Sequence, residues 1–141
     1  MSTAREVPRT ARARADDRLH ATWIALAAGT MIALSLGVHL AVLRAAGGVG
    51  PATARAWAGP YLLGLCLAFL TGGGIVGWFS PGNTFKEAAA SGGAAVTLLA
   101  AVSLVAGRGR GIEAILLAAF AGLVLALIGG WLGEWLKGKT R

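Results

Sequence analysis

The chain has 141 residues, which suits one domain, and 56% of them are hydrophobic while 13% are charged. Soluble domains carry about 25% charged residues, so this composition and a mean hydropathy of +0.69 exclude an ordinary soluble protein. The net charge of +7 does not indicate a nucleic-acid-binding protein, because the basic residues flank apolar runs and no basic stripe is interleaved with aromatic residues. We therefore predict an all-α, multi-pass membrane protein.

The first 18 residues are polar and contain five arginines, together with Pro8, which interrupts any helix. We predict that residues 1–18 are a flexible basic tail on the cytoplasmic side and that residues 19–141 form a four-helix transmembrane domain. The apolar run that follows the tail exceeds the ~7–15 residues of a signal-peptide core, so we expect it to remain as a signal anchor.

The first predicted span covers residues 21–43, long enough for the ~20 residues that a helix needs to cross a bilayer. Small residues recur at every fourth position along it, including Ala25, Gly29, Ala33 and Gly37. Such a row lets two helix backbones approach closely. We therefore expect this face to pack against another helix.

Two side chains within the apolar runs are candidates for chemistry. His39 is ionisable and lies four residues after Ser35 on the same helix, so the two side chains could touch. A nucleophile needs an oriented base, and no acidic residue in the same membrane layer would orient His39. We expect His39 to be interfacial or hydrogen-bonded, and we predict neither catalytic activity nor a cofactor.

Cys66 is the only cysteine. One cysteine cannot form an internal disulfide, and no histidine or acidic partners are spaced around it as metal ligands usually are. We expect Cys66 to be a small buried hydrophobic side chain, and we predict no metal site.

The second and third predicted spans cover residues 58–79 and 85–106. Both contain closely spaced glycines, which favour direct contact between helix backbones. The glycines that we expect at helix contacts in these spans are Gly73, Gly77, Gly92 and Gly93.

Turn-forming residues at 80–83 separate these two spans and predict a membrane hairpin. Thr84 and Glu87 have the spacing of a capping box, in which each side chain bonds to the backbone N–H of the other residue. Lys86 and Glu87 are the charged residues of this loop. If the loop binds a partner, these two are the expected contact points.

The fourth predicted span covers residues 112–136, with Gly122 and Gly130 as its expected packing residues. If the N-terminus is cytoplasmic, nine basic residues lie on the cytoplasmic side and four on the other. The positive-inside rule therefore favours an even number of spans with both termini cytoplasmic. We expect the protein to lie in the cell membrane, meaning the inner or plasma membrane.

The sequence favours a non-enzymatic accessory, anchoring or assembly component whose partners are membrane lipids and other membrane helices or a second copy. The alternative is a small dimeric channel or transporter. In size and span count the chain resembles small multidrug transporters and fluoride channels, both compact four-span families. Small multidrug transporters rely on a glutamate within the first span, and residues 21–43 contain none.

Overall fold

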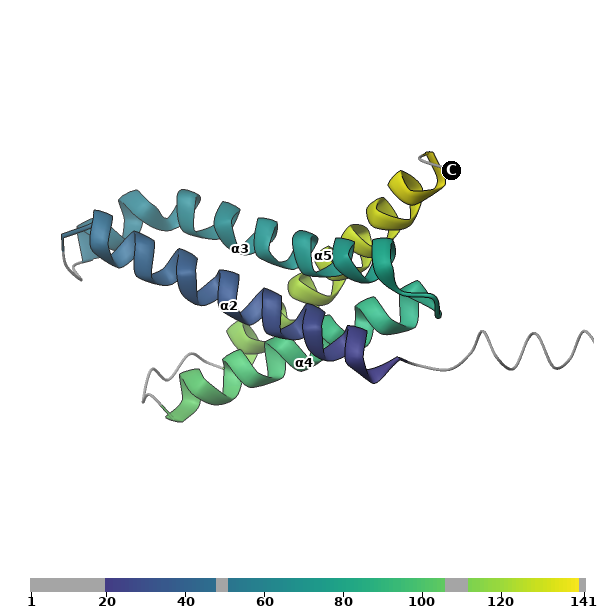
Figure 1. Ribbon diagram of the computed structural model, residues 1–141. Helices are drawn as coiled ribbons and strands as arrows, with labels where there is room; N and C mark the ends of the chain where they lie inside the picture. Colours follow the sequence, from purple (N-terminus) through teal and green to yellow (C-terminus); the bar gives the residue numbers. More distant parts are fainter. Residues whose placement is uncertain (1–19, 48–50, 106–111, 140–141) are drawn as a thin grey trace, which may run out of the picture.

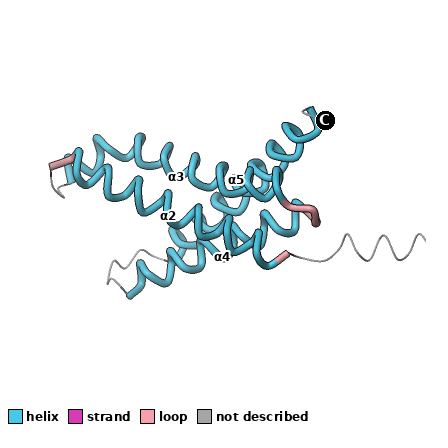
Figure 2. The backbone as a smooth tube through the Cα atoms, viewed as in Figure 1, coloured by secondary structure: helices cyan, strands magenta, loops and turns pink. Residues whose placement is uncertain are grey.

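Long apolar runs with no interior charge favour helices, because a helix satisfies its backbone hydrogen bonds within one segment. The computed structural model describes residues 20–47, 51–105 and 112–139, and it is helical there apart from short turns (Figures 1 and 2). The prediction of an all-α fold is confirmed. The predicted basic tail lies outside the described residues, as do residues 48–50 and 106–111.

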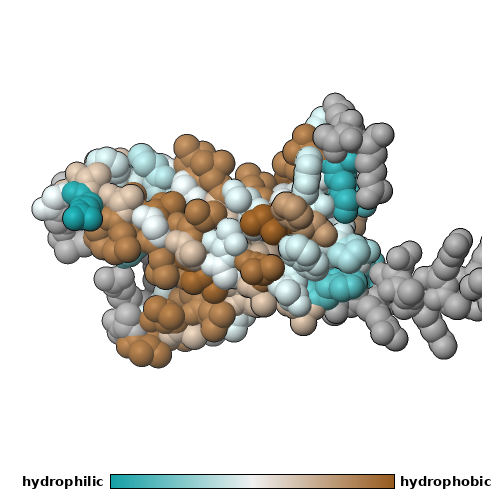
Figure 3. Space-filling model, viewed as in Figure 1, coloured by the Kyte–Doolittle hydropathy of each residue, from teal (hydrophilic) through white to brown (hydrophobic). Residues whose placement is uncertain are grey.

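Four helices in the described part of the chain are long and apolar enough to cross a membrane, as the sequence predicts. Their bounds are Ala21–Ala45 for α2, Pro51–Phe79 for α3, Thr84–Val105 for α4 and Ile112–Lys139 for α5. Three begin within one residue of the predicted spans. Figure 3 shows hydrophobic side chains over the middle of the molecule and hydrophilic patches toward its ends. The fold is that of a small multi-pass membrane protein.

The start of α3 corrects one prediction. The helix begins at Pro51, not at residue 58, so much of the expected connection is helical. Proline suits the first helical position because its missing N–H would have no partner there, and the following alanines and arginine favour helix. Pro60 consequently lies inside α3.

The helices α3 and α5 form the most extensive pair of the bundle, while α2 packs on α3 and α4. Figure 1 shows α5 crossing behind α3 and emerging beyond it at the C-terminal end. Toward the opposite end, α2 and α3 remain side by side but draw away from α4 (Figure 1). The buried core is built from small side chains together with Met31, Phe69, Val76 and Val96.

The contact between α3 and α5 depends on glycine. A Cβ atom added at Gly73 would overlap the carbonyl oxygen of Ala126, and one added at Gly77 would overlap that of Gly130. Two helices can approach this closely only where the residue that faces the neighbouring carbonyl oxygen has no side chain. The sequence indicated these three glycines but missed Gly129 and Gly133, which abut α3 backbone carbonyls in the same way.

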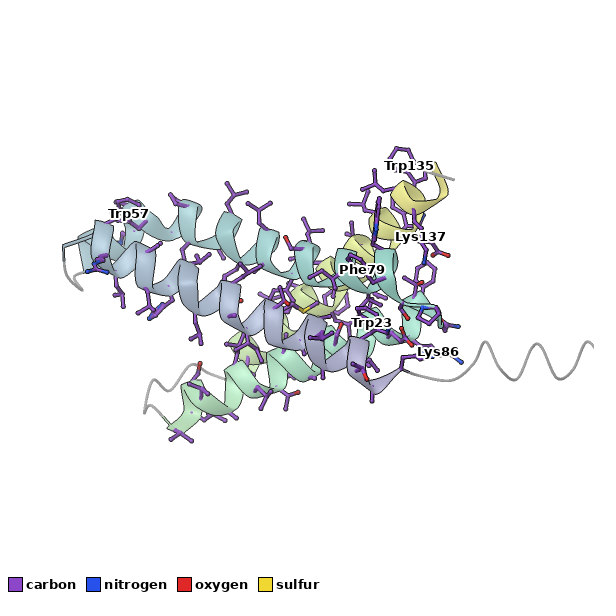
Figure 4. All side chains as sticks on the ribbon, viewed as in Figure 1. Trp23, Trp57, Phe79, Lys86, Trp135 and Lys137 are labelled. Carbon is purple, nitrogen blue, oxygen red and sulfur yellow. The ribbon has the colours of Figure 1, made fainter. Side chains whose placement is uncertain are left out.

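Both described ends of the chain meet the turn between α3 and α4. The His20 N–H donates a hydrogen bond to Glu87, and Lys137 Nζ donates one to the Ser80 carbonyl oxygen at 3.4 Å. The start of α2 and the end of α5 therefore lie at one end of the bundle. Figure 4 shows Lys86 and Lys137 at that end and Trp57 at the other.

Candidate functional site

A cluster of polar side chains surrounds Glu87, which is 0% exposed. Its Oε1 accepts a hydrogen bond from the His20 N–H at 2.8 Å and lies 3.1 Å from His20 Nδ1. Its Oε2 accepts a short hydrogen bond from the Ser80 hydroxyl. We call Glu87, Ser80 and His20 the polar cluster. It joins residues that precede α2, follow α3 and begin α4.

The α3–α4 turn places Ser80 at the centre of this network. The Ser80 N–H donates to the Val76 carbonyl at 2.9 Å and so closes the last turn of α3. The Ser80 hydroxyl also accepts from the Gly82 N–H at 3.1 Å, and this bond shapes the turn. Ser80 is 4% exposed, and its carbonyl accepts from Lys137 of α5. One serine therefore connects the hairpin to the fourth helix.

The predicted capping box is wrong, because Asn83 caps α4. Asn83 Oδ1 accepts from the Lys86 N–H at 3.2 Å, and the Asn83 carbonyl accepts from the Glu87 N–H at 3.0 Å. These are the bonds of an N-cap residue, so the helix begins one residue earlier than a Thr84 cap requires. Lys86 then occupies the third helical position, from which a capping-box side chain would bond back to the N-cap, and the Glu87 carboxylate binds His20 and Ser80 instead.

Glu87 is also not an accessible contact point on the loop, which corrects a second prediction. It lies in the first turn of α4, and its side chain turns inward to meet the donors of His20 and Ser80. A carboxylate near a helix N-terminus is favourable, and Glu87 lies at the start of both α2 and α4. Lys86, the other predicted contact residue, is exposed.

The order of the groups in the polar cluster limits its chemistry. Nucleophilic catalysis of the serine–histidine type requires the imidazole to accept the hydroxyl proton. Here the Ser80 hydroxyl donates directly to the carboxylate, and the same carboxylate meets His20 on its other oxygen. The Glu87 carboxylate therefore connects three segments of the chain. Among the described residues, no imidazole is placed to accept the Ser80 hydroxyl proton.

A second polar region lies in the half of the bundle where the helices diverge. A cavity of about 320 Å³ lies between the four helices, and its wall is mostly apolar. The polar or sulfur-bearing side chains that line it are Ser35, His39, Tyr61, Cys66 and Ser103. Lys, Arg, Asp and Glu are absent from the described residues that line it.

Ser35 differs from three other hydroxyl-bearing residues of the apolar helices. It is 4% exposed, and its Oγ has no hydrogen-bond partner among the described residues. By contrast, the Thr30, Thr97 and Ser103 hydroxyls each donate to the carbonyl four residues earlier, all at 2.8 Å. Leaving a buried hydroxyl unpaired costs about 1–3 kcal/mol. The contact between Ser35 and His39 that their spacing allows is therefore not a hydrogen bond.

His39 is partly buried and lies against an aromatic ring. Its imidazole meets the Tyr61 ring edge-on, with ring centroids 6.0 Å apart. Both rings line the cavity, and His39 lies about one helical turn beyond Ser35 on α2. Cys66 is also partly exposed to this cavity and is not fully buried as expected. No three His, Cys, Asp or Glu side chains in the described ranges are grouped so that they could hold a metal ion.

The predicted packing residues divide into two sets. Those enclosed by neighbouring helices are Gly73, Gly77, Gly92, Gly122 and Gly130. Those without a close helix neighbour in the described part of the chain are Ala25, Gly29, Ala33, Gly37 and Gly93. The α2 row does not pack inside the bundle because α2 turns its other side inward, the side with Ala27, Met31 and Ser35.

Sequence reasoning missed both polar regions. His20 and the 80–87 turn could have been connected, because an even number of spans places them on the same side of the membrane. The sequence contains no such signal for the cavity, because Ser35, Tyr61 and Ser103 lie on different helices and only the packing brings them together.

Comparison with known proteins finds no matching family model, no matching curated protein and no matching solved structure.

Proposed function

We propose that this protein is a non-enzymatic accessory, anchoring or assembly component that packs against other membrane helices through one face of α2. This face consists of the small residues Ala21, Ala25, Gly29, Ala33, Gly37 and Ala41, and we call it the small-residue face. All six are exposed, and a Cβ atom added at Gly29 or Gly37 would meet no atom of the described residues within 4 Å.

The contrast with the α3–α5 contact supports this proposal. There the same kind of pattern, Gly73 and Gly77, is fully occupied by α5. Lipid tails do not drive helices together by the hydrophobic effect, so close backbone packing supplies much of the attraction between membrane helices. A row with fourfold spacing favours a partner helix that crosses at about −40°. The exposed Leu26, Leu36 and Leu40 lie beside the row and would flank such a partner.

The experiment compares two glycines that are both unpacked within the chain. Gly29→Leu fills the small-residue face, whereas Gly93→Leu, the control, adds the same bulk to α4. The protein is extracted in mild detergent, and its size and co-purifying proteins are determined. We expect Gly29→Leu to abolish association and Gly93→Leu to preserve it, both at unchanged melting temperature. An unmodified protein that purifies only as a monomer without a partner contradicts the proposal.

A small dimeric channel or transporter is the second candidate, and the cavity is the observation that favours it. Ser35, near the middle of α2, and His39, one helical turn further along, both line the cavity. A path for solutes through the membrane would need such polar groups. Liposomes that contain the purified protein test this candidate. Transport predicts measurable flux of ions or small solutes over empty liposomes, and the absence of flux removes it.

We also propose that both termini face the cytoplasm of a cell or plasma membrane. The support is the excess of basic residues on that side, nine against four. Basic residues near the ends of membrane spans tend to stay on the cytoplasmic side, so their distribution sets the orientation of the protein in the membrane.

A further inference from the structure

We infer that the cavity between the four helices binds a neutral, lipid-soluble molecule that carries a carbonyl group, with the Ser35 hydroxyl as its hydrogen-bond donor. This inference is independent of the small-residue face, because the cavity is inside the bundle and α2 presents its opposite side there. The volume of about 320 Å³ is at the lower end of the range of small-molecule pockets, roughly 300–1,000 Å³.

The unpaired hydroxyl of Ser35 is the first observation that points to a ligand. Ser35 lines the cavity, is 4% exposed and has no hydrogen-bond partner. The Ser103 hydroxyl lines the same cavity but donates to the Leu99 carbonyl of its own helix at 2.8 Å. Buried polar groups in proteins are nearly always paired. A carbonyl oxygen in the cavity would supply the missing acceptor.

The shape of the cavity indicates a bound molecule that approaches from the diverging end. Toward the centre of the bundle, Phe69 and Val96 close it, and a Cβ atom at Gly122 would lie 2.8 Å from Val96 Cγ2 and 3.0 Å from Phe69 Cε1. Toward the other end, α2 and α3 separate from α4 (Figure 1), and the His39 and Tyr61 rings line the cavity.

The lining selects the chemical class. Lys, Arg, Asp and Glu are absent from it among the described residues, so nothing there compensates for the desolvation of an ionic ligand. The apolar wall favours a hydrocarbon or aromatic body, and Ser35 favours one oxygen acceptor at a defined position. Two sources share this chemistry, namely the ester of a membrane lipid and a free lipophilic ketone or quinone-like compound.

The test uses benzophenone, a neutral aromatic ketone that crosslinks to adjacent C–H groups under ultraviolet light. The full chain in mild detergent is titrated with benzophenone and irradiated, and the labelled residues are mapped by mass spectrometry. We expect saturable labelling of the cavity wall. Ser35→Ala should raise the half-saturating concentration about tenfold, as expected for one lost hydrogen bond in a buried site.

Ser103→Ala is the matched control, because it removes a hydroxyl of the same cavity that is already paired. It should change the half-saturating concentration less than twofold. Ser35→Ala should also leave the melting temperature of the ligand-free protein unchanged or higher, since the hydroxyl that it removes is unpaired. Ala100→Phe, which fills the cavity from α4, should abolish the saturable labelling.

Analysis of molecules that co-purify with the unmodified protein distinguishes the two sources. A stoichiometric ester lipid identifies the membrane itself as the source, and a free carbonyl compound identifies a dedicated ligand. Either should be lost from Ser35→Ala and retained by Ser103→Ala. The inference is overturned if benzophenone labelling does not saturate, or if the two serine variants behave alike.

Discussion

The N–H of His20 donates a hydrogen bond to Glu87 Oε1 at 2.8 Å, across 67 residues of sequence. His20 is the N-cap residue of α2, and its own side chain makes no capping hydrogen bond. The buried carboxylate of α4 therefore satisfies a backbone donor at the start of another helix. This places a negative charge where the dipoles of two helices favour it.

The first prediction concerns the loss of this carboxylate. Glu87→Ala leaves the buried Ser80 hydroxyl and the part-buried His20 N–H without their acceptor. Each unpaired donor costs about 1–3 kcal/mol, so we expect the free energy of unfolding to fall by about 3 kcal/mol or more. Titration of a denaturing detergent into mild-detergent micelles measures this change.

Two further variants make the result specific to the carboxylate. Glu87→Gln retains one acceptor oxygen and should lose less stability than Glu87→Ala. Glu134→Ala removes an exposed carboxylate on α5 and should change the free energy of unfolding by less than about 0.5 kcal/mol. Equal stability of Glu87→Ala and Glu134→Ala would show that the polar cluster does not join the helices.

The second prediction places the cap of α4 at Asn83. Asn83→Ala removes the acceptor of the Lys86 N–H and should lower the free energy of unfolding by about 1 kcal/mol. Asn83→Ser keeps a capping oxygen and should retain most of that stability. Unfolding titrations of the two variants and the unmodified protein decide the matter, and identical curves for all three would contradict an Asn83 cap.

The third prediction concerns the crossing of α3 and α5. In Gly77→Ala the new methyl group would overlap the Gly130 carbonyl, so the helices must separate. Overpacking of this kind typically costs about 1–3 kcal/mol, measured as a loss in the free energy of unfolding. Gly93→Ala adds a methyl group where no atom lies within 4 Å and should be neutral or slightly stabilising. A Gly77→Ala protein as stable as Gly93→Ala would argue against the close crossing.

The fourth prediction concerns two aromatic rings near the polar cluster. Trp23 of α2 and Phe79 of α3 are stacked, with ring centroids 5.8 Å apart and an interplanar angle of 10° (Figure 4). Stacked pairs are worth about 0.5–1.5 kcal/mol beyond their buried area. A double-mutant cycle with Trp23→Leu and Phe79→Leu should give a coupling energy of that size. Strictly additive effects on the free energy of unfolding would mean that the rings do not interact.

The fifth prediction tests the proposed orientation. Arg55, near the start of α3, and Lys86, near the start of α4, are exposed and lie toward opposite ends of the bundle. Each is replaced singly by cysteine in a Cys66→Ala background. Membrane-impermeant thiol reagents should label position 55 in intact cells and position 86 only after the membrane is opened. The reverse pattern would place both termini outside the cytoplasm.

Much of the fold was predictable because it depends on local chemistry. Apolar runs of more than 20 residues predict helices wherever they occur, and turn residues at 80–83 predict a hairpin whatever surrounds it. The predicted cap failed by one residue because Asn83 and Thr84 are both good N-cap residues. In the structure Asn83 accepts the capping hydrogen bond, and the Glu87 carboxylate is already bound by His20 and Ser80.

The candidate sites were less predictable. Gly29 and Gly77 belong to similar rows of small residues, yet one is exposed and the other is in contact with α5. A row of small residues shows that a backbone can be approached, and it does not identify the helix that approaches. Ser35 likewise resembles Ser103 in sequence, and only the structure shows that one hydroxyl is unpaired.

By itself the sequence determined four membrane-length helices, their order and the hairpin between the second and third, since length, hydropathy and turn chemistry are properties of short segments. Only the tertiary structure decided which face of each helix is buried, that Glu87 is enclosed with His20 and Ser80, and that the buried Ser35 lies at the wall of a cavity. A helix that is apolar on every side can turn any of its faces toward lipid, so hydropathy does not determine which face packs against another helix. Backbone fit at glycine and a few buried hydrogen bonds make that choice.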